Sequence, residues 1–379
     1  MEGRVVKAAN SRPSIVLTGP RQTGKTTLLQ DAFPKHKFIS LDLPTDAELA
    51  EKDPLTFIGI HQPPLILDEI QYAPSIFRYL KVVIDGRRDE KGLFLLTGSL
   101  KFPLMQDISE SLAGRIEILE LESLALSEIR QAAPDFTIEE IIVRGGYPEL
   151  YRDLKLDSIA FYRSYIATYL ERDVRNILQV TSLRDFERFM RACAIRSGQL
   201  LNKNDLARDI GISPSTANQW LTALQASGQI HLLEPWFNNK SKQFVKSPKL
   251  YIADTGILCT LLNIFSVDDL NRSPLRGNIW ESLVFAELRK REFARHGGWK
   301  IYFYNDRTRE VDFVIDRGGQ YELLEAKYVE RPDDRDQRAL KQVSAILGEA
   351  AVVRRAIVGR VSRAYPLNDG IQAVPLEDL

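Results

Sequence analysis

The sequence of 379 residues contains only two cysteines, Cys193 and Cys259, and they are not spaced as a C-x-x-C pair. This scarcity excludes a disulfide scaffold and a cysteine-based zinc module, and we expect a chain that works in a reducing compartment. No apolar run approaches the roughly 18 residues of a membrane helix, and the first residues lack the apolar segment of a signal peptide. We therefore expect a cytoplasmic protein with no membrane partner.

The chain also has no excess of charge of either sign, because 51 Lys and Arg residues balance 51 Asp and Glu residues. This balance excludes a globally basic, histone-like binder. Hydrophobic residues make up 44% of the chain and charged residues 27%, which is typical of globular proteins and excludes a disordered or collagen-like chain. At about 100–200 residues per domain, the length predicts two or three domains.

The strongest motif follows a short apolar run, Ser14–Leu17, which we interpret as a buried strand. A G-x-x-x-x-G-K-T pattern between a strand and a helix is a P-loop, whose glycines let backbone N–H groups approach phosphate oxygens. Lys25 is expected to neutralise the β- and γ-phosphates, and Thr26 to bind Mg²⁺. ATP and Mg²⁺ are therefore the predicted cofactors. The predicted nucleotide-binding residues are Gly19, Pro20, Arg21, Gln22, Thr23, Gly24, Lys25, Thr26 and Thr27.

A second apolar segment, Pro64–Leu67, ends in two adjacent carboxylates. This is the Walker B arrangement, in which Asp68 would hold Mg²⁺ through water and Glu69 would act as the general base toward the attacking water. The apolar segment Leu93–Leu96 then leads to Thr97 and Ser99. A polar residue there senses the γ-phosphate in P-loop ATPases with an extra central strand. Spacing alone does not choose between these two residues, and we take Ser99 as the catalytic candidate.

Arg115 precedes a further apolar segment, Ile116–Leu119. An arginine at this place is a candidate arginine finger, which stabilises transition-state charge at the γ-phosphate of a neighbouring subunit. The alternative is a surface arginine in a local salt bridge. The finger interpretation requires an oligomer. With Lys37–Leu41, five apolar strands alternate with helical stretches, a pattern that predicts an α/β fold with a parallel sheet covered on both faces.

In the middle of the chain, the spacing of apolar residues over Tyr151–Leu178 is typical of helix. A winged helix is predicted to follow. Its helices are Lys203–Ile210 and Pro214–Leu224, its strand begins near Gly228, and Lys240 and Lys242 lie on the wing. Ten Lys and Arg residues against five Asp and Glu residues make residues 184–249 basic, by about +5. DNA is therefore a predicted partner. The second helix carries no Lys or Arg, so a lid or a subunit-packing module is the alternative.

The C-terminal part carries the order of residues found in PD-(D/E)xK nucleases. Asp312 lies on one predicted strand, and Glu325 and Lys327 lie on the next, where alternation places them on the same face. Asp312 and Glu325 would bind Mg²⁺, Lys327 would orient the attacking water, and Glu281 on the preceding helix would complete the site. The alternatives are an exposed polar strand face, or an inherited nuclease fold that serves structure or partner binding without cleavage.

Taken together, these motifs resemble those of a known family. Gly19–Thr26, Leu67–Gln71, Leu96–Ser99 and Leu112–Arg115 resemble the AAA-like ATPases of the AAA_14 family, and the remainder resembles their usual partner region, the DUF4143 domain. The DUF4143-like motifs are Arg144–Pro148, Tyr169–Val174, Ser247–Tyr251, Asp254–Gly256 and Glu310–Phe313. The resemblance implies an ATP-binding protein. In related ATPases a proline of a G-x-P motif packs on the nucleotide base, which makes Pro148 a nucleotide-contact candidate.

These inferences combine into one prediction for the whole chain. We expect an AAA-like ATPase domain at residues 1–150, a helical lid and winged helix at 151–250, and a restriction-endonuclease-like domain at 251–379. The predicted function is ATP hydrolysis by a homo-oligomer, with a hexameric ring as one form, that engages DNA. The alternative is a nucleotide-controlled signalling switch whose nuclease-like domain is an inactive binding module.

Overall fold

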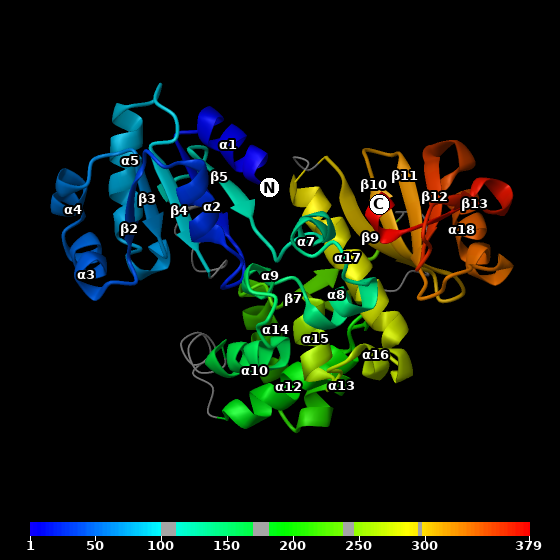
Figure 1. Ribbon diagram of the computed structural model, residues 1–379. Coiled ribbons are helices and arrows are strands. Elements are labelled where there is room, and N and C mark those ends of the chain that lie inside the picture. Colours follow the sequence, from blue (N-terminus) through cyan, green and yellow to red (C-terminus); the bar gives the residue numbers. More distant parts are fainter. Residues whose placement is uncertain (100–110, 170–181, 238–245, 295–297) are drawn as a thin grey trace. The chain divides into compact units, whose positions relative to one another are not determined.

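The computed structural model describes residues 1–99, 111–169, 182–237, 246–294 and 298–379 (Figure 1). The chain divides into two compact units, of which unit 1 is built on Met1–Ser123 and unit 2 on most of residues 124–379. The two wing residues Lys240 and Lys242 lie outside the described residues.

Unit 1 is a parallel five-stranded sheet in the order β2-β3-β4-β1-β5. The five strands form where the apolar segments predicted them, so the prediction of a parallel α/β sheet is confirmed, with β4 inserted between β1 and β3. The strands are β1 (Ser14–Thr18), β2 (Lys37–Ser40), β3 (Leu65–Asp68), β4 (Phe94–Gly98) and β5 (Ile116–Glu120). The helices are α1 (Glu2–Ser11), α2 (Lys25–Ala32), α3 (Pro44–Lys52), α4 (Pro54–Ile60) and α5 (Ile76–Gly86), with the 3-10 turn η1 (Ile70–Tyr72).

The three central strands of unit 1, β1, β3 and β4, are buried along their whole length, which explains why they are nearly continuous apolar runs. The edge strands β2 and β5 are partly exposed. Val16 and Leu67 point to one face and pack with apolar residues of α3, α4 and α5. Ile15 and Leu17 point to the other face and pack against α1 and α2. This alternation follows from the period of two of a strand. Because all five strands are parallel, their carboxyl ends lie at one edge of the sheet.

Unit 2 contains a six-stranded mixed sheet in the order β13-β14-β12-β11-β10-β9. Phe313 and Leu324 pack on one face with α17, and Val314 and Leu323 pack on the other with α18. The strands are β9 (Lys300–Asn305), β10 (Glu310–Asp316), β11 (Tyr321–Ala326), β12 (Val352–Val358), β13 (Tyr365–Pro366) and β14 (Gln372–Val374). The helical elements here are α17 (Arg276–Ala294), α18 (Asp334–Leu347), η3 (Glu349–Ala351), η4 (Asn368–Gly370) and η5 (Leu376–Asp378).

The rest of unit 2 is mainly helical, with a three-stranded antiparallel sheet in the order β6-β8-β7. Its helices are α7 (Leu126–Ala132), α8 (Ile138–Arg144), α9 (Pro148–Arg152), α10 (Ser158–Tyr169), α12 (Leu183–Ile195), α13 (Lys203–Ile210), α14 (Pro214–Ala226), α15 (Thr255–Leu261) and α16 (Val267–Arg272). Its strands are β6 (Gln199–Leu200), β7 (Ile230–Leu233) and β8 (Lys249–Ile252). Cys193 on α12 and Cys259 on α15 are both buried as free thiols. In the described ranges, no helix combines the length and apolar character that a membrane span requires.

The predicted helix-turn-helix elements form as α13 and α14. The side chain of Asn202 accepts backbone hydrogen bonds at the start of α13, and Gly211 ends that helix in the left-handed region at φ +83°. Ser213 accepts a bond of 3.0 Å from the Thr216 N–H at the start of α14. Because the wing falls outside the described residues, the winged helix stays a prediction.

The helical stretch predicted from Tyr151 is interrupted in the described residues. Helix α9 ends at Arg152, and α10 begins only at Ser158. The Asp153 carboxylate accepts a 3.0 Å bond from the Lys155 N–H, and the Asp157 carboxylate accepts a 2.9 Å bond from the Ile159 N–H. Aspartates compete in this way with the helical ladder for backbone donors, and the apolar periodicity did not reveal the interruption.

Candidate functional site

The P-loop lies between β1 and α2 in unit 1, in a backbone conformation that needs its glycines. Gly19 has φ +142°, and a Cβ built there would lie 2.0 Å from the Leu121 carbonyl oxygen. Gly24, at φ +88°, adopts the left-handed region directly before α2. These two positions therefore accept only glycine without displacement of the backbone, and they keep the loop curled at the N-terminus of α2.

Lys25 is the first residue of α2 and is buried, with 6% of its surface exposed. Its Nζ donates to the carbonyl oxygens of Gly19 at 3.1 Å and Pro20 at 2.7 Å. The ammonium is therefore directed at the loop itself. Thr23 stabilises the same curl, since its Oγ1 donates to the Pro20 carbonyl at 2.9 Å.

Three side chains from three elements meet at the carboxyl end of β3. Asp68 Oδ1 accepts hydrogen bonds of 2.6 Å from Thr26 Oγ1 and of 2.6 Å from Thr97 Oγ1. Asp68 is 7% exposed. The structure thus brings together the predicted metal residues Thr26 and Asp68, and it places Thr97 directly beside them. Hydroxyl and carboxylate oxygens are the hard donors that Mg²⁺ prefers, so these residues fit the ion.

Glu69 follows Asp68 with φ +56°, a left-handed conformation that is uncommon for a residue with a side chain. Its N–H donates to Thr97 Oγ1 at 3.0 Å, which holds this conformation. Its Oε2 accepts bonds from Ser99 Oγ at 2.9 Å and from the amide of Gln71. Ser99 therefore contacts the carboxylate of the predicted base, whereas Thr97 contacts the carboxylate of Asp68 and only the backbone of Glu69. The two candidates that spacing left open occupy different places.

Arg115 forms an ion pair within unit 1. Its Nε donates to Asp85 Oδ1 at 2.8 Å, and its Nη2 donates to Asp85 Oδ2 at 3.0 Å. The hydrogen bond from Arg115 lowers the pKa of Asp85, and the same bond raises the pKa of Arg115. The local salt bridge that sequence analysis kept as the alternative is thus present, and a role as a finger would require its exchange for another anion.

Pro148 lies in unit 2, at the first turn of α9, next to the fully buried ring of Tyr147. The glycines before it pack around Asp254, the residue that caps α15. Asp254 Oδ2 accepts a 2.8 Å bond from the Gly146 N–H, and Oδ1 accepts a 2.9 Å bond from Tyr162 OH. The Arg144–Pro148 and Asp254–Gly256 motifs therefore meet in one packed junction.

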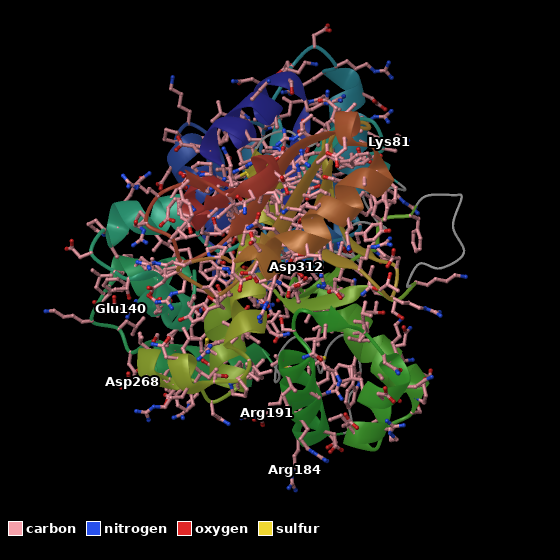
Figure 2. All side chains as sticks on the ribbon, turned by 90° about the vertical axis from the view of Figure 1, so that its right-hand side faces the viewer. Lys81, Glu140, Arg184, Arg191, Asp268 and Asp312 are labelled. Carbon is pink, nitrogen blue, oxygen red and sulfur yellow. The ribbon has the colours of Figure 1, made fainter. Side chains whose placement is uncertain are left out.

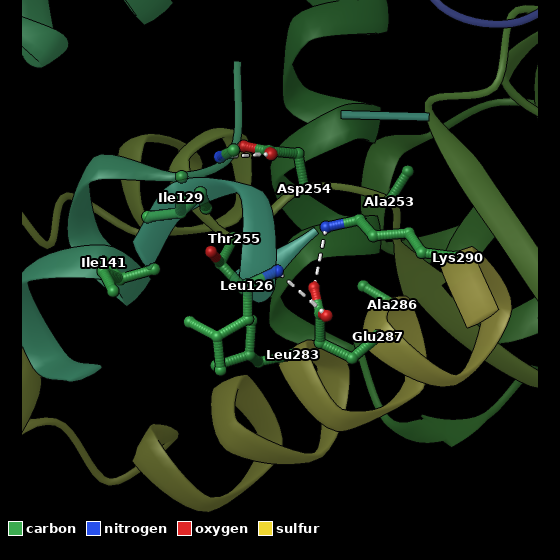
Figure 3. Close-up of a pocket in the computed structure, with 12 residues that line it drawn as sticks. Leu126, Ile129, Ile141, Ala253, Asp254, Thr255, Leu283, Ala286, Glu287 and Lys290 are labelled. Atoms are coloured by element: carbon green, nitrogen blue, oxygen red, sulfur yellow. Dashed lines mark hydrogen bonds and ion pairs between the residues drawn. The ribbon is translucent and has the colours of Figure 1, made fainter. Parts of the chain in front are cut away.

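A small cavity beside this junction has a volume of about 10 Å³ (Figure 3), room for about one water molecule. Figure 3 shows Glu287 and Lys290 of α17 directed at its rim, where Glu287 accepts a 3.0 Å bond from the Leu126 N–H and pairs with Lys290 at 3.0 Å. These polar groups satisfy one another. The cavity itself is therefore too small for a nucleotide, and Pro148 is not among the residues that line it.

The four predicted nuclease-like residues lie together in unit 2: Glu281 on α17, Asp312 on β10, Glu325 on β11, and Lys327 directly after β11. Lys327 Nζ lies 3.0 Å from Glu325 Oε2 and 4.0 Å from Asp312 Oδ2. A further lysine, Lys249 of β8, lies among them, with its Nζ 2.9 Å from Glu281 Oε1 and 3.3 Å from Asp312 Oδ1. We call these five residues, with Glu310 and Tyr251, the Lys249 cluster. Asp312 is buried, whereas Figure 2 shows labelled residues such as Glu140, Arg184 and Asp268 at the outline of the molecule.

Burial and mutual attraction set the protonation of the Lys249 cluster. Burial alone would lower the pKa of Lys249, but the surrounding Tyr251, Asp312 and Glu281 raise it well above its ordinary value, so the ammonium stays charged. Burial also opposes ionisation of Asp312, but the two lysines outweigh it and lower its pKa to about 2. Burial, reinforced by the Asp312 charge, raises the pKa of Glu325 well above its ordinary value.

Two residues of these sites received no role from the sequence. Gln71 and Lys249 both lie in motifs that carried the family resemblance, yet neither matches a known catalytic spacing. The signal for Gln71 was its place directly after the Walker B carboxylates. The carboxylates that accept hydrogen bonds from Lys249 lie 32 or more residues away along the chain. A motif based on local spacing therefore could not predict these contacts.

Three family models match the chain in succession. A model described as an AAA domain matches residues 11–130, and the models of two domains of unknown function, DUF8612 and DUF4143, match residues 135–268 and 276–379. The recognised AAA_14 and DUF4143 regions are confirmed. Four of the five motifs that we attributed to DUF4143 begin outside its matched range, within residues 135–268, and only Glu310–Phe313 lies inside it.

The chain is similar over nearly its whole length to a mycobacterial protein. It is 32% identical over 381 aligned positions to the uncharacterized protein Rv2008c of Mycobacterium tuberculosis, covering 99% of this chain and 83% of that protein. It is 28% identical over 352 positions to the uncharacterized protein MJ1544 of Methanocaldococcus jannaschii, covering 83% and 74%. Among solved structures, the Walker-type ATPase of Pyrococcus abyssi covers 69% of this chain and 94% of its own, at 16% identity and a TM-score of 0.47.

Proposed function

Because this chain belongs to the family of AAA ATPases that carry a C-terminal DUF4143 domain, we propose that unit 1 binds ATP with Mg²⁺ and hydrolyses it. The observation that carries the proposal is the meeting of the P-loop, Asp68, Glu69 and Ser99 at one edge of the parallel sheet. Ligands bind outside the carboxyl ends of the strands in folds of this kind.

The phosphates of ATP are held by the P-loop. The backbone N–H groups around Gly24 and the N-terminus of α2 provide donors and a positive dipole end. Lys25 exchanges its bonds to the Gly19 and Pro20 carbonyls for phosphate oxygens, which carry a full negative charge and form stronger hydrogen bonds. Thr26 and Asp68 hold Mg²⁺, which when bound neutralises charge on the terminal phosphates.

Glu69 acts as the general base toward the attacking water. A carboxylate in this position accepts a proton from the water as the bond to phosphorus forms, and Ser99 positions the γ-phosphate beside it. The hydrogen bonds from Ser99 and Gln71 support this role, because they hold the carboxylate in one orientation at the edge of the sheet.

Unit 2 is proposed to engage DNA. The proposed domains of the whole chain are the ATPase domain at residues 1–150, the helical lid and winged helix at 151–250, and the nuclease-like domain at 251–379. The basic stretch of residues 184–249 supports a nucleic-acid partner through phosphate contacts. Pro148 is retained as a nucleotide-contact candidate, and Arg115 as a finger acting between subunits of a homo-oligomer.

A second candidate function is a nucleotide-controlled switch with slow hydrolysis. The ion pair between Arg115 and Asp85 supports it, because an arginine engaged within its own subunit is withheld from a neighbouring active site. The two functions differ in a measurable way. A switch changes its native mass between ADP and ATP while it turns over slowly, and a DNA-driven machine turns over faster when DNA is added.

The ATPase proposal is tested with two substitutions. Lys25→Ala is expected to abolish binding of a fluorescent ATP analogue, whereas Glu69→Gln is expected to keep binding and lower phosphate release by about 100-fold or more, because it removes only the base. Gln30→Ala, at an exposed position on α2, is the matched control and should behave as wild type. Normal turnover by Lys25→Ala would refute the site.

A further inference from the structure

The Lys249 cluster contains its own cation at the centre of the predicted metal site. Lys249 Nζ lies 2.9 Å from Glu281 Oε1, 3.3 Å from Asp312 Oδ1 and 2.6 Å from Glu310 Oε1. These carboxylates come from α17 and β10, and the lysine comes from β8. The ammonium therefore bridges carboxylates of two elements, among them the predicted metal residues Asp312 and Glu281.

Three further contacts engage carboxylate oxygens of the Lys249 cluster. Asp312 Oδ2 accepts a 3.0 Å bond from the Ala326 N–H, and Glu325 Oε2 pairs with Lys327 at 3.0 Å. Glu281 Oε1 accepts a second bond, of 2.6 Å, from Tyr251 OH. Across the described ranges of the chain, no group of three or more His, Cys, Asp or Glu side chains is arranged to hold a metal ion. Because Lys249 already pairs with Glu281, Asp312 and Glu310, the residues of this cluster do not fit a divalent ion.

Lys249 is also fixed in place. Its side chain is 2% exposed, and its ammonium lies 5.7 Å from the centre of the Phe303 ring. If this ammonium moved away from its partners, both the lysine and the carboxylates would be left as buried charges without a partner. Its displacement therefore costs free energy. A divalent ion would have to displace this ammonium rather than fill an open position.

We infer that Lys249 is the built-in cation of this site, that the site takes no divalent metal ion, and that unit 2 does not cleave nucleic acid by metal-dependent hydrolysis. Unit 2 is then a nuclease-like module that binds DNA without cutting it, and the binding of DNA in this statement rests on the proposed function. The assignment of the cation rests on the geometry of unit 2 alone.

The first test counts metal ions on the full chain without nucleotide. Mn²⁺ binding is followed by the loss of the free-ion paramagnetic resonance signal, in an Asp68→Asn background that removes the metal residue of unit 1. Adding Asp312→Asn or Glu281→Gln is expected to leave the number of bound Mn²⁺ ions unchanged. One ion fewer per chain in either variant would overturn the inference.

The second test removes the cation. Lys249→Met keeps the length of the side chain but leaves buried carboxylates unpaired, and is expected to lower Tm by about 6 °C or more. In the same Asp68→Asn background, millimolar Mn²⁺ should then raise the Tm of this variant by about 3 °C by binding the freed carboxylates, with no effect on the protein that keeps Lys249 or on Lys249→Arg. Equal Mn²⁺ stabilisation of all three proteins, lost with Asp312→Asn, would contradict the inference. If Lys249→Met does not fold, the ion count in the first test decides alone.

The third test separates this inference from the DNA proposal. Fluorescence anisotropy with duplex, branched and single-stranded DNA in EDTA is expected to show binding, and incubation with Mn²⁺ is expected to leave each DNA intact. Absence of binding would refute the proposed DNA engagement and leave the cation assignment standing. A Mn²⁺-dependent product that disappears with Asp312→Asn would refute the assignment itself.

Discussion

At the scale of the residue, Glu69 combines a left-handed backbone with a side chain held by two donors. The amide of Gln71 contacts both the Glu69 carboxylate and Ser99 Oγ, the latter at 3.4 Å. The other end of the same amide, Gln71 Oε1, is buried and has no hydrogen-bond partner in the described part of the chain. Because the carbonyl oxygen of this amide forms no hydrogen bond, we expect Gln71 to contribute little to the stability of the fold. Its expected role is to position the Glu69 carboxylate through its N–H groups.

Gln71→Ala is therefore expected to lower kcat for ATP hydrolysis about tenfold, equivalent to one lost hydrogen bond to a charged group, with little change in KM. Steady-state phosphate release measures both constants. Gln71→Glu places a second carboxylate beside Glu69 and should be slower still, because like charges repel. A rise in KM with unchanged kcat would instead assign Gln71 to ATP binding.

Sequence and structure diverge most at this scale. The P-loop and Walker B residues were predicted because each set is contiguous and its chemistry depends on local spacing. Which carboxylate Thr97 and Ser99 each contact depends on how the end of β4 lies beside the end of β3 in the folded sheet. The place of Lys249 depends on three elements that meet only in the folded chain, and alternation of side chains along one strand carries no information about such a meeting.

At the scale of the element, three helices of unit 2 approach one another through glycines. A Cβ on Gly256 of α15 would lie 2.3 Å from the ring of Tyr162 on α10, and a Cβ on Gly145 would lie 2.0 Å from the hydroxyl of the same tyrosine. The motifs Arg144–Pro148 and Asp254–Gly256 are thus explained by close packing. Their spacing in the sequence showed where the chain turns but gave no sign that the two turns pack together.

Gly256→Ala is expected to destabilise the protein by about 1–3 kcal/mol, because the added methyl group overpacks a buried contact. Gly277→Ala on α17 is the matched control, since a Cβ there meets nothing within 4 Å, and it should be neutral or stabilising by up to about 1 kcal/mol. Denaturant unfolding followed by circular dichroism measures both. Equal stability of the two variants would show that the junction relaxes around the added methyl group.

At the scale of the whole molecule, the zero net charge is a sum of opposed regions. The basic stretch of residues 184–249 is balanced by acids elsewhere, and these include Asp68 and Glu69 at the sheet edge of unit 1. We therefore expect a single chain to have little unspecific attraction for DNA, and the proposed homo-oligomer would concentrate the basic stretch.

Assembly is tested with mixed subunits. Arg115→Ala and Glu69→Gln proteins are each expected to lose most ATP turnover, and mixing them should restore part of it if Arg115 acts on a neighbouring subunit. The Asp85→Asn variant, which frees Arg115 from its present partner, should raise turnover only at protein concentrations at which native mass spectrometry detects an oligomer. Failure of the mixture to recover activity would assign Arg115 to its salt bridge with Asp85 alone.

The two buried cysteines have a practical consequence for labelling. Burial raises the pKa of both thiols, and their side chains are closed to solvent, so neither offers a reactive thiolate to maleimide dyes at neutral pH. A cysteine introduced at an exposed position such as Lys81 would then be the only reactive site. The natural sequence is thus ready for single-dye spectroscopy without removal of its own cysteines.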